Sequence, residues 1–140
     1  MSQQQPTAQY AQPEPHSSTR IAPVAVNPVA INPVSVNLVE AGLTASHSGP
    51  QWAHECEDLD MTLLSWKLGQ RIEPHINHEV DVVWIGVAGS GTATINGEPH
   101  ELLPGLLLLI PKSCERGIES TSERFSYISI HRRRRGLMPT

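Results

Sequence analysis

The first third of the sequence has little charge and almost no aromatic side chain. Residues 1–51 contain three Asp, Glu, Lys or Arg residues and one aromatic residue, but seven of the twelve prolines. Such a segment has little apolar area to offset the entropy lost when its backbone is ordered. We therefore expect residues 1–35 to be a disordered Pro/Gln-rich extension. A folded domain is expected over residues 36–131, with a basic tail over residues 132–140.

Long apolar runs and paired cysteines are also missing. The longest apolar run, Leu102–Ile110, is interrupted by Pro104 and Gly105 and falls short of the ~20 residues that span a bilayer. The N-terminus has neither the basic nor the apolar region of a secretory signal. The two cysteines, Cys56 and Cys114, form no CxxC pattern, which favours reduced thiols and leaves one disulfide open. We expect a cytoplasmic protein without a membrane partner.

Positive charge is scarce except at the C-terminus, where Arg132–Arg135 form a run in a chain of net charge -4. This run favours a solvated tail or an ion pair between subunits, and nucleic acid is an unlikely partner. A five-residue repeat (PVAVN, PVAIN, PVSVN) fills residues 23–37. It is either a linker that expanded by slippage or a strand donated to a partner subunit. Its end, Val34–Val39, alternates briefly and predicts a first strand.

No stretch shows a sustained apolar period of 3.6 residues, so the folded part is expected to be all-β. Asn96-Gly97 predicts a type I′ hairpin, because both residues of that turn need positive φ. About eight short strands separated by turn residues indicate a sandwich or a jelly-roll barrel. The clearest strands are expected at Leu59–Leu68, Val80–Ala88, Thr92–Ile95, Leu106–Ile110 and Arg124–His131.

Glycines and prolines from residue 89 onward resemble the cupin signature. Gly89 and Gly91 close its first block, TATINGE matches its hairpin, and Pro111 follows Gly105 by six residues in its second block. The resemblance covers about residues 36–131. It implies a cupin-type jelly-roll β-barrel, whose usual site offers three histidines and one carboxylate to Fe, Mn, Ni or Zn.

The ligand positions of that signature are degraded in this sequence. The position of the third histidine holds Arg116, and the position of the glutamate holds Val82. Depending on the gap, the two histidine positions hold His75 and Asn77, or Ile76 and His78. Arginine offers no lone pair and would repel a cation, so no metal cofactor is favoured. Any metal present would use the remaining candidate ligands, which are His75, His78, Glu79 and Asp81.

The segment around these positions is rich in polar residues. If residues 75–81 form one strand, its alternate residues share one face, which is either solvated or the lining of the barrel. Arg116 would then pair with Glu79 or Asp81, or hold an anionic ligand. Trp84 is the aromatic residue nearest to such a pocket, although a core position is the simpler interpretation. The predicted ligand pocket consists of His75, Asn77, Glu79, Asp81, Trp84 and Arg116.

Two functions remain open at this stage. The favoured one is a small cupin-domain protein without catalytic activity that binds a small polar or anionic ligand in the barrel. The alternative is a metal-dependent cupin enzyme of the dioxygenase or isomerase type with a nonstandard ligand set. A homodimer is expected in either case, because pairing protects exposed edge strands.

Overall fold

The structure is a computed structural model that describes residues 33–134. Most of the predicted extension and its repeat, and the last residues of the basic tail, lie outside this range. The elements are α1 (Leu38–Leu43), β1 (Gly49–Glu55), β2 (Leu59–Lys67), β3 (Arg71–Ile76), β4 (Val82–Ala88), β5 (Gly91–Ile95), β6 (Glu98–Leu102), β7 (Leu107–Ile110), β8 (Glu115–Ser120) and β9 (Arg124–Arg132).

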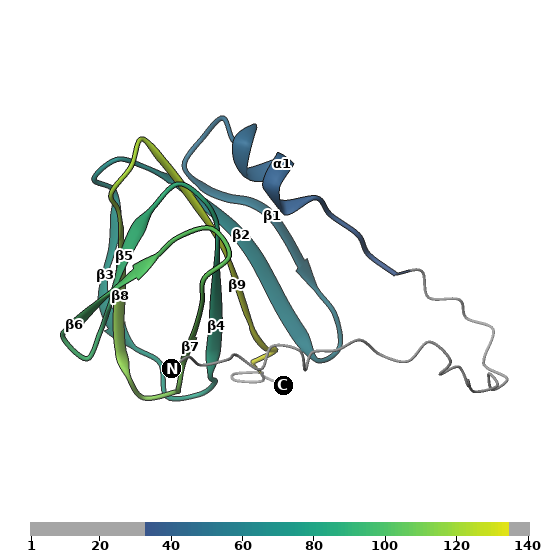
Figure 1. The fold of residues 1–140 in the computed structure, drawn as a ribbon. Helices are drawn as coiled ribbons and strands as arrows, with labels where there is room; N and C mark the ends of the chain where they lie inside the picture. The colour runs from purple at the N-terminus through teal and green to yellow at the C-terminus, as the bar shows by residue number, and fades with distance from the viewer. Residues whose placement is uncertain (1–32, 135–140) are drawn as a thin grey trace, which may run out of the picture. The chain divides into compact units, whose positions relative to one another are not determined.

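The strands form two antiparallel sheets that face each other (Figure 1). The five-stranded sheet has the order β1-β2-β9-β4-β7, and the four-stranded sheet has the order β3-β8-β5-β6. Both sheets contribute to one apolar core, made of Val80, Val82, Trp84, Ala93, Leu102, Ile110, Ile118, Phe125 and Tyr127. The predicted all-β architecture of two packed sheets is confirmed, and each strand predicted from Leu59 onward is present within a few residues of its expected ends.

Alternation along β8 separates the two faces of the four-stranded sheet. Arg116, Ile118 and Ser120 are buried and face the other sheet, whereas Glu115 and Glu119 are exposed on the outer face. Directly paired residues on neighbouring strands share a face. The inner row at Arg116 therefore includes His75 of β3 and Ile95 of β5.

The predicted first strand is wrong, because α1 begins within it. Asn37 caps the helix, with its Oδ1 accepting a hydrogen bond of 2.9 Å from the backbone N–H of Glu40. The helix lies on the outer face of the five-stranded sheet, and a Cβ added to Gly42 would lie 3.2 Å from the Cβ of Ser126. Glycine at this position allows the close approach.

The predicted Asn96-Gly97 hairpin is confirmed, since Asn96 has φ 51° and Gly97 has φ 86° between β5 and β6. In the described part of the chain, β1, β3, β6 and β7 are sheet edges. The exposed leucines Leu107 and Leu109 lie on one of them, β7. The homodimer expected from such edges stays a prediction. No helix within residues 33–134 has the length and hydropathy to cross a membrane.

Candidate functional site

The polar segment after β3 is a turn rather than a strand. β3 ends at Ile76, and the Oδ1 of Asn77 accepts hydrogen bonds from the backbone N–H groups of Glu79 (2.6 Å) and Val80 (3.2 Å). Asparagine favours such turns because its side chain satisfies backbone donors two and three residues on. Residues 75–81 therefore do not form one strand, and Asn77, Glu79 and Asp81 do not form a row on one strand face.

Residues 77–81 are fastened to the loop between β7 and β8. The Oδ1 of Asp81 accepts a hydrogen bond of 2.8 Å from the backbone N–H of Lys112. The backbone N–H of Ser113 donates to the carbonyl of Asn77 at 2.7 Å, and its Oγ lies 2.9 Å from the Nδ1 of His78. Asp81 and His78 thus hold two loops together at one end of the sheets.

Arg116 lies beside these loops on the inner face of β8. Arg116 is paired directly with His75 across the two strands. Only 3% of the surface of Arg116 is exposed, whereas the side chain of His75 is exposed to solvent. The Nη1 of Arg116 is buried without a hydrogen-bond partner. Within residues 33–134 Arg116 forms no ion pair; the carboxylate of Glu79 lies 4.0 Å from the Nε of Arg134, and the carboxylate of Asp81 accepts from the backbone N–H of Lys112. The predicted pairing of Arg116 with Glu79 or Asp81 is wrong.

The surroundings of Arg116 disfavour its positive charge. Burial lowers the pKa of the Arg116 guanidinium, the charge of Arg134 lowers it further, and Cys114 opposes both effects. Arginine keeps its proton at any physiological pH, so the shift leaves a cation in an unfavourable environment. Buried polar groups in proteins nearly always have a partner. Among the described residues, the Nη1 of Arg116 is an exception to this rule.

Away from Arg116, the inner faces meet in an aromatic centre formed by Trp84, Phe125 and Tyr127. The rings of Trp84 and Tyr127 lie 5.4 Å apart, and those of Phe125 and Tyr127 lie 5.2 Å apart and are stacked. Burial raises the pKa of Tyr127 to about 12, although the side chain of Trp66 partly opposes the shift. Trp84 thus lies in the core. We call the region of His75, Arg116, residues 77–81 and Arg134 the arginine end.

The metal that the cupin resemblance implies does not fit these residues. Within residues 33–134 no three His, Cys, Asp or Glu side chains gather closely enough to hold a metal ion. Val82 points into the apolar core and Arg116 carries a positive charge, so two of the four usual positions cannot ligate a cation. In the register that places His75 and Asn77 at the two histidine positions, Asn77 uses its side-chain oxygen to form the turn.

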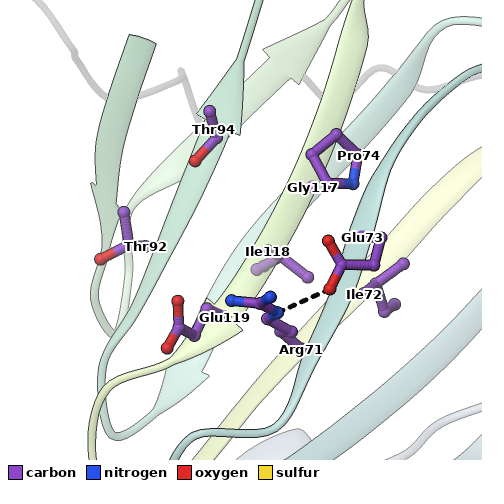
Figure 2. Close-up of a pocket in the computed structure, with 9 residues that line it drawn as sticks. All are labelled: Arg71, Ile72, Glu73, Pro74, Thr92, Thr94, Gly117, Ile118 and Glu119. Atoms are coloured by element: carbon purple, nitrogen blue, oxygen red, sulfur yellow. Dashed lines mark hydrogen bonds and ion pairs between the residues drawn. The ribbon is translucent and has the colours of Figure 1, made fainter. Parts of the chain in front are cut away.

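A pocket of ≈ 220 Å³ lies on the opposite, outer face of β3, β8 and β5. Figure 2 shows Thr92 and Thr94 on one side, Glu73 and Pro74 on the other, and Gly117 between them. A Cβ added to Gly117 would lie 3.0 Å from the backbone oxygen of Ile72 and 3.0 Å from the backbone nitrogen of Pro74, so glycine at this position lets β3 approach β8 closely. Arg71 already pairs with Glu73 at 2.7 Å, and both side chains are more than half exposed. The pocket therefore offers no buried charge for recognition.

Two features of this region were not predicted from the sequence. The outer pocket lies on the face of β8 opposite to Arg116, and assigning residues to that face requires the alternation of β8 to be known. The position of Arg134 next to Glu79 had no signal beyond following the last strand, since the sequence does not show where the end of β9 lies. Arg134 brings a second guanidinium to the arginine end.

Comparisons with known proteins support the fold more strongly than any activity. The sequence is 35% identical over 72 residues to a dimethylsulfoniopropionate lyase (DddW) of Ruegeria pomeroyi, which covers 50% of this chain and 47% of the lyase. The chain thus spans about half the length of this curated relative. No family model matches the sequence.

Solved structures resemble the chain over most of its described length. A protein from Bacillus halodurans has a TM-score of 0.65 at 19% identity, covering 82% of this chain and 92% of that one. A cupin protein from Bacteroides fragilis has a TM-score of 0.51 at 21% identity, covering 59% and 72% of the two chains. The likeness shows that residues 33–134 have the cupin fold, as the glycine and proline spacing indicated.

Proposed function

We propose that the chain is a small-molecule-binding protein of the cupin fold that holds an anionic ligand on Arg116, without a catalytic metal. The observation that carries the proposal is the buried Nη1 of Arg116, which has no hydrogen-bond partner. A buried polar group without a partner costs about 1–3 kcal/mol, and more when it is charged. A ligand that supplies the missing partner is stabilised by the same amount.

The chemical class of the ligand follows from the guanidinium. Its planar donors match the two oxygens of a carboxylate or two oxygens of a phosphate, and such bidentate pairs are stronger than neutral hydrogen bonds. The exposed side chain of His75, directly opposite Arg116, marks the side from which a ligand reaches it. The adjacent core is apolar, which suits a ligand with a short hydrocarbon part.

The test is anion binding by the full chain, measured by calorimetry with acetate, malonate and inorganic phosphate. Arg116→Gln is expected to abolish binding, because the amide removes the charge and keeps part of the side-chain volume. Arg124→Gln is a matched control, since the Nη1 of Arg124 is also buried and unpaired. Arg124 starts the nine-residue strand β9, about 25 Å from its end at Arg132, so it lies far from the arginine end.

Equal loss of binding in the two variants would mean that general positive charge, and not Arg116, attracts the anion. Binding that survives Arg116→Gln would contradict the proposal. A third outcome also overturns it: near-stoichiometric Fe, Mn, Ni or Zn retained by the purified protein after chelation and dialysis. Elemental analysis of the same preparation measures the metal content.

A metal-dependent cupin enzyme is the second candidate, because the curated relative is a lyase whose named substrate is a carboxylate. This chain would have to assemble a nonstandard ligand set from His75, His78, Glu79 and Asp81. Two of these side chains, His78 and Asp81, already bind the β7–β8 loop. Stoichiometric metal that is lost in His75→Ala would favour this candidate over the binding protein.

A further inference from the structure

The four edge strands of the described sheets differ in how well they exclude a further strand. Charged residues and prolines on an edge prevent another strand from pairing with it. The strands β1, β3 and β6 each contain a proline and at least one charged residue. The strand β7 reads LLLI and contains neither, and Leu107 and Leu109 are 55% and 60% exposed. Among residues 33–134, β7 is thus the one edge without either kind of protection.

The backbone groups of Leu107 and Leu109 point to the open side of β7. The N–H of Gly86 in β4 donates to the carbonyl of Leu106 at 2.9 Å, which shows where the ladder between the two strands begins. In an antiparallel ladder every second residue bonds to the neighbouring strand, and the residues between them point their N–H and C=O groups the other way. Leu108 therefore bonds to β4, whereas Leu107 and Leu109 present their N–H and C=O groups to the side that has no neighbouring strand.

We propose that β7 pairs with β7 of a second copy of this chain, so that the two five-stranded sheets join at these edges. A two-fold axis makes the two copies of one strand antiparallel and the interface self-complementary. With Leu108 on the axis, Leu107 of each copy lies opposite Leu109 of the other. Both leucines then form hydrogen bonds through the backbone groups on the open side, and their side chains meet on one face of the joined sheet.

The other registers of this pairing are less favourable. A shift by one residue places Leu107 opposite Ile110, whose side chain is buried in the core and whose place in the ladder directs its backbone groups to β4. A shift by two residues places Leu107 opposite Pro111, which has no N–H, or places Leu109 opposite Gly105, which lies in a turn. The run of four leucines reads the same in both directions, so a second copy supplies a matching edge.

The size of the contact predicts its strength. A standard interface between two proteins buries about 800 Å² on each partner and uses about 20–30 residues a side. The strand β7 has four residues, so an interface centred on it is much smaller. We therefore expect a reversible dimer with a dissociation constant on the order of tens of micromolar.

Sedimentation equilibrium of the full chain over a wide range of protein concentration measures this association. The unmodified chain is expected to dimerise as its concentration rises. Leu109→Lys should weaken the dimer at least about tenfold, because pairing would remove the lysine charge from water. Leu68→Lys is the matched control, since Leu68 is also 60% exposed but lies in the turn after β2.

Two double variants test the register. Leu107→Glu combined with Leu109→Lys places opposite charges across the axis, so the dimer should be stronger than in Leu109→Lys alone. Leu107→Lys combined with Leu109→Lys places like charges there and should abolish the dimer. Net charge alone predicts the reverse order, because the second pair of changes brings the charge of -4 closer to zero. Equal association of the two double variants would overturn the proposed pairing.

Amide hydrogen exchange of the full chain shows what covers the edge. The N–H groups of Leu107 and Leu109 should be protected only at concentrations where the dimer forms, whereas the N–H of Leu108 should be protected at every concentration. Protection of Leu107 and Leu109 that does not depend on concentration would assign the edge to another segment of the same chain, such as residues 23–32, and would overturn the inference. A chain that stays monomeric, or a dimer that Leu68→Lys weakens as much as Leu109→Lys, would also overturn it.

Discussion

The aromatic centre and Arg116 both lie on the inner faces of the sheets, but the first is apolar and the second is charged. In the aromatic centre, the rings of Trp84, Phe125 and Tyr127 pack against one another. At the arginine end, Arg116 is equally buried and has an unpaired nitrogen. Burial of apolar rings stabilises the fold, whereas burial of an unpaired cation weakens it. The difference separates residues that hold the fold together from a residue that we propose to hold a ligand.

The largest expected effect is the loss of an aromatic ring from the core. Phe125→Ala should lower the free energy of unfolding by about 3–5 kcal/mol, because the ring is fully buried and its removal leaves a cavity. Urea denaturation followed by tryptophan fluorescence measures the change. A loss below about 1 kcal/mol would show that the aromatic centre collapses around the missing ring and is less rigid than its stacking indicates.

The next effect depends on pH. The pKa of Tyr127 is raised from 10.0 to about 12, so the folded protein keeps this proton at a pH where the unfolded chain loses it. The raised pKa of Tyr127 contributes about 2–3 kcal/mol to the free energy of unfolding. This contribution is complete below pH 10 and is lost as the pH rises toward 12. Unfolding free energies at pH 9 and pH 11.5 measure it. Tyr127→Phe, which cannot ionise, should lose less stability over the same range, and an equal loss would point to other groups.

Removing the buried cation should have the opposite sign. Arg116→Met is expected to raise the free energy of unfolding by about 1–2 kcal/mol without added anion, because an apolar side chain replaces an unpaired charge. The gain should vanish in saturating malonate, which stabilises only the unmodified protein. Thermal denaturation with and without malonate measures both. A large loss of stability in Arg116→Met would mean that Arg116 has a structural partner.

The smallest effect is expected on the outer pocket. Thr92→Val changes a lining residue of that pocket and should alter the unfolding free energy by less than about 0.5 kcal/mol. Malonate affinity should stay the same, since Thr92 lies on the outer face of the sheet and Arg116 on the inner face. A clear fall in malonate affinity would show that malonate binds in the pocket of Figure 2 and not at the arginine end.

The spacing of glycines and prolines predicted the fold because these residues report backbone constraints that few other residues meet. Gly89, Gly97 and Gly105 all have positive φ, and a Cβ added to Gly91 would lie 2.3 Å from the ring of Phe125. Such requirements are local, so a sequence pattern can reveal them. The helix α1 was missed because six residues give no detectable period, and the valines before it alternate like a strand.

The contacts of the site could not be predicted in the same way. The turn at Asn77 forms because its side-chain oxygen accepts hydrogen bonds from the backbone N–H groups of Glu79 and Val80. The alternation of polar and apolar residues does not reveal whether a side chain forms such bonds or the segment continues as a strand. Arg116 was singled out by its place in the cupin pattern, and its role as a ligand-binding residue stays a prediction. Whether Glu79 faces Arg116 or Arg134 depends on where the end of β9 lies, which is a tertiary property.

The turn at Asn77 also bears on how this chain could evolve. Its side-chain oxygen accepts from the N–H groups of both Glu79 and Val80, and a histidine at this position would leave those donors without the same acceptor. Placing histidines at Asn77 and Arg116 and a glutamate at Val82 would recreate the familiar ligand sequence on a loop of a different shape. The usual cupin ligand set therefore also requires a turn of different shape at residue 77.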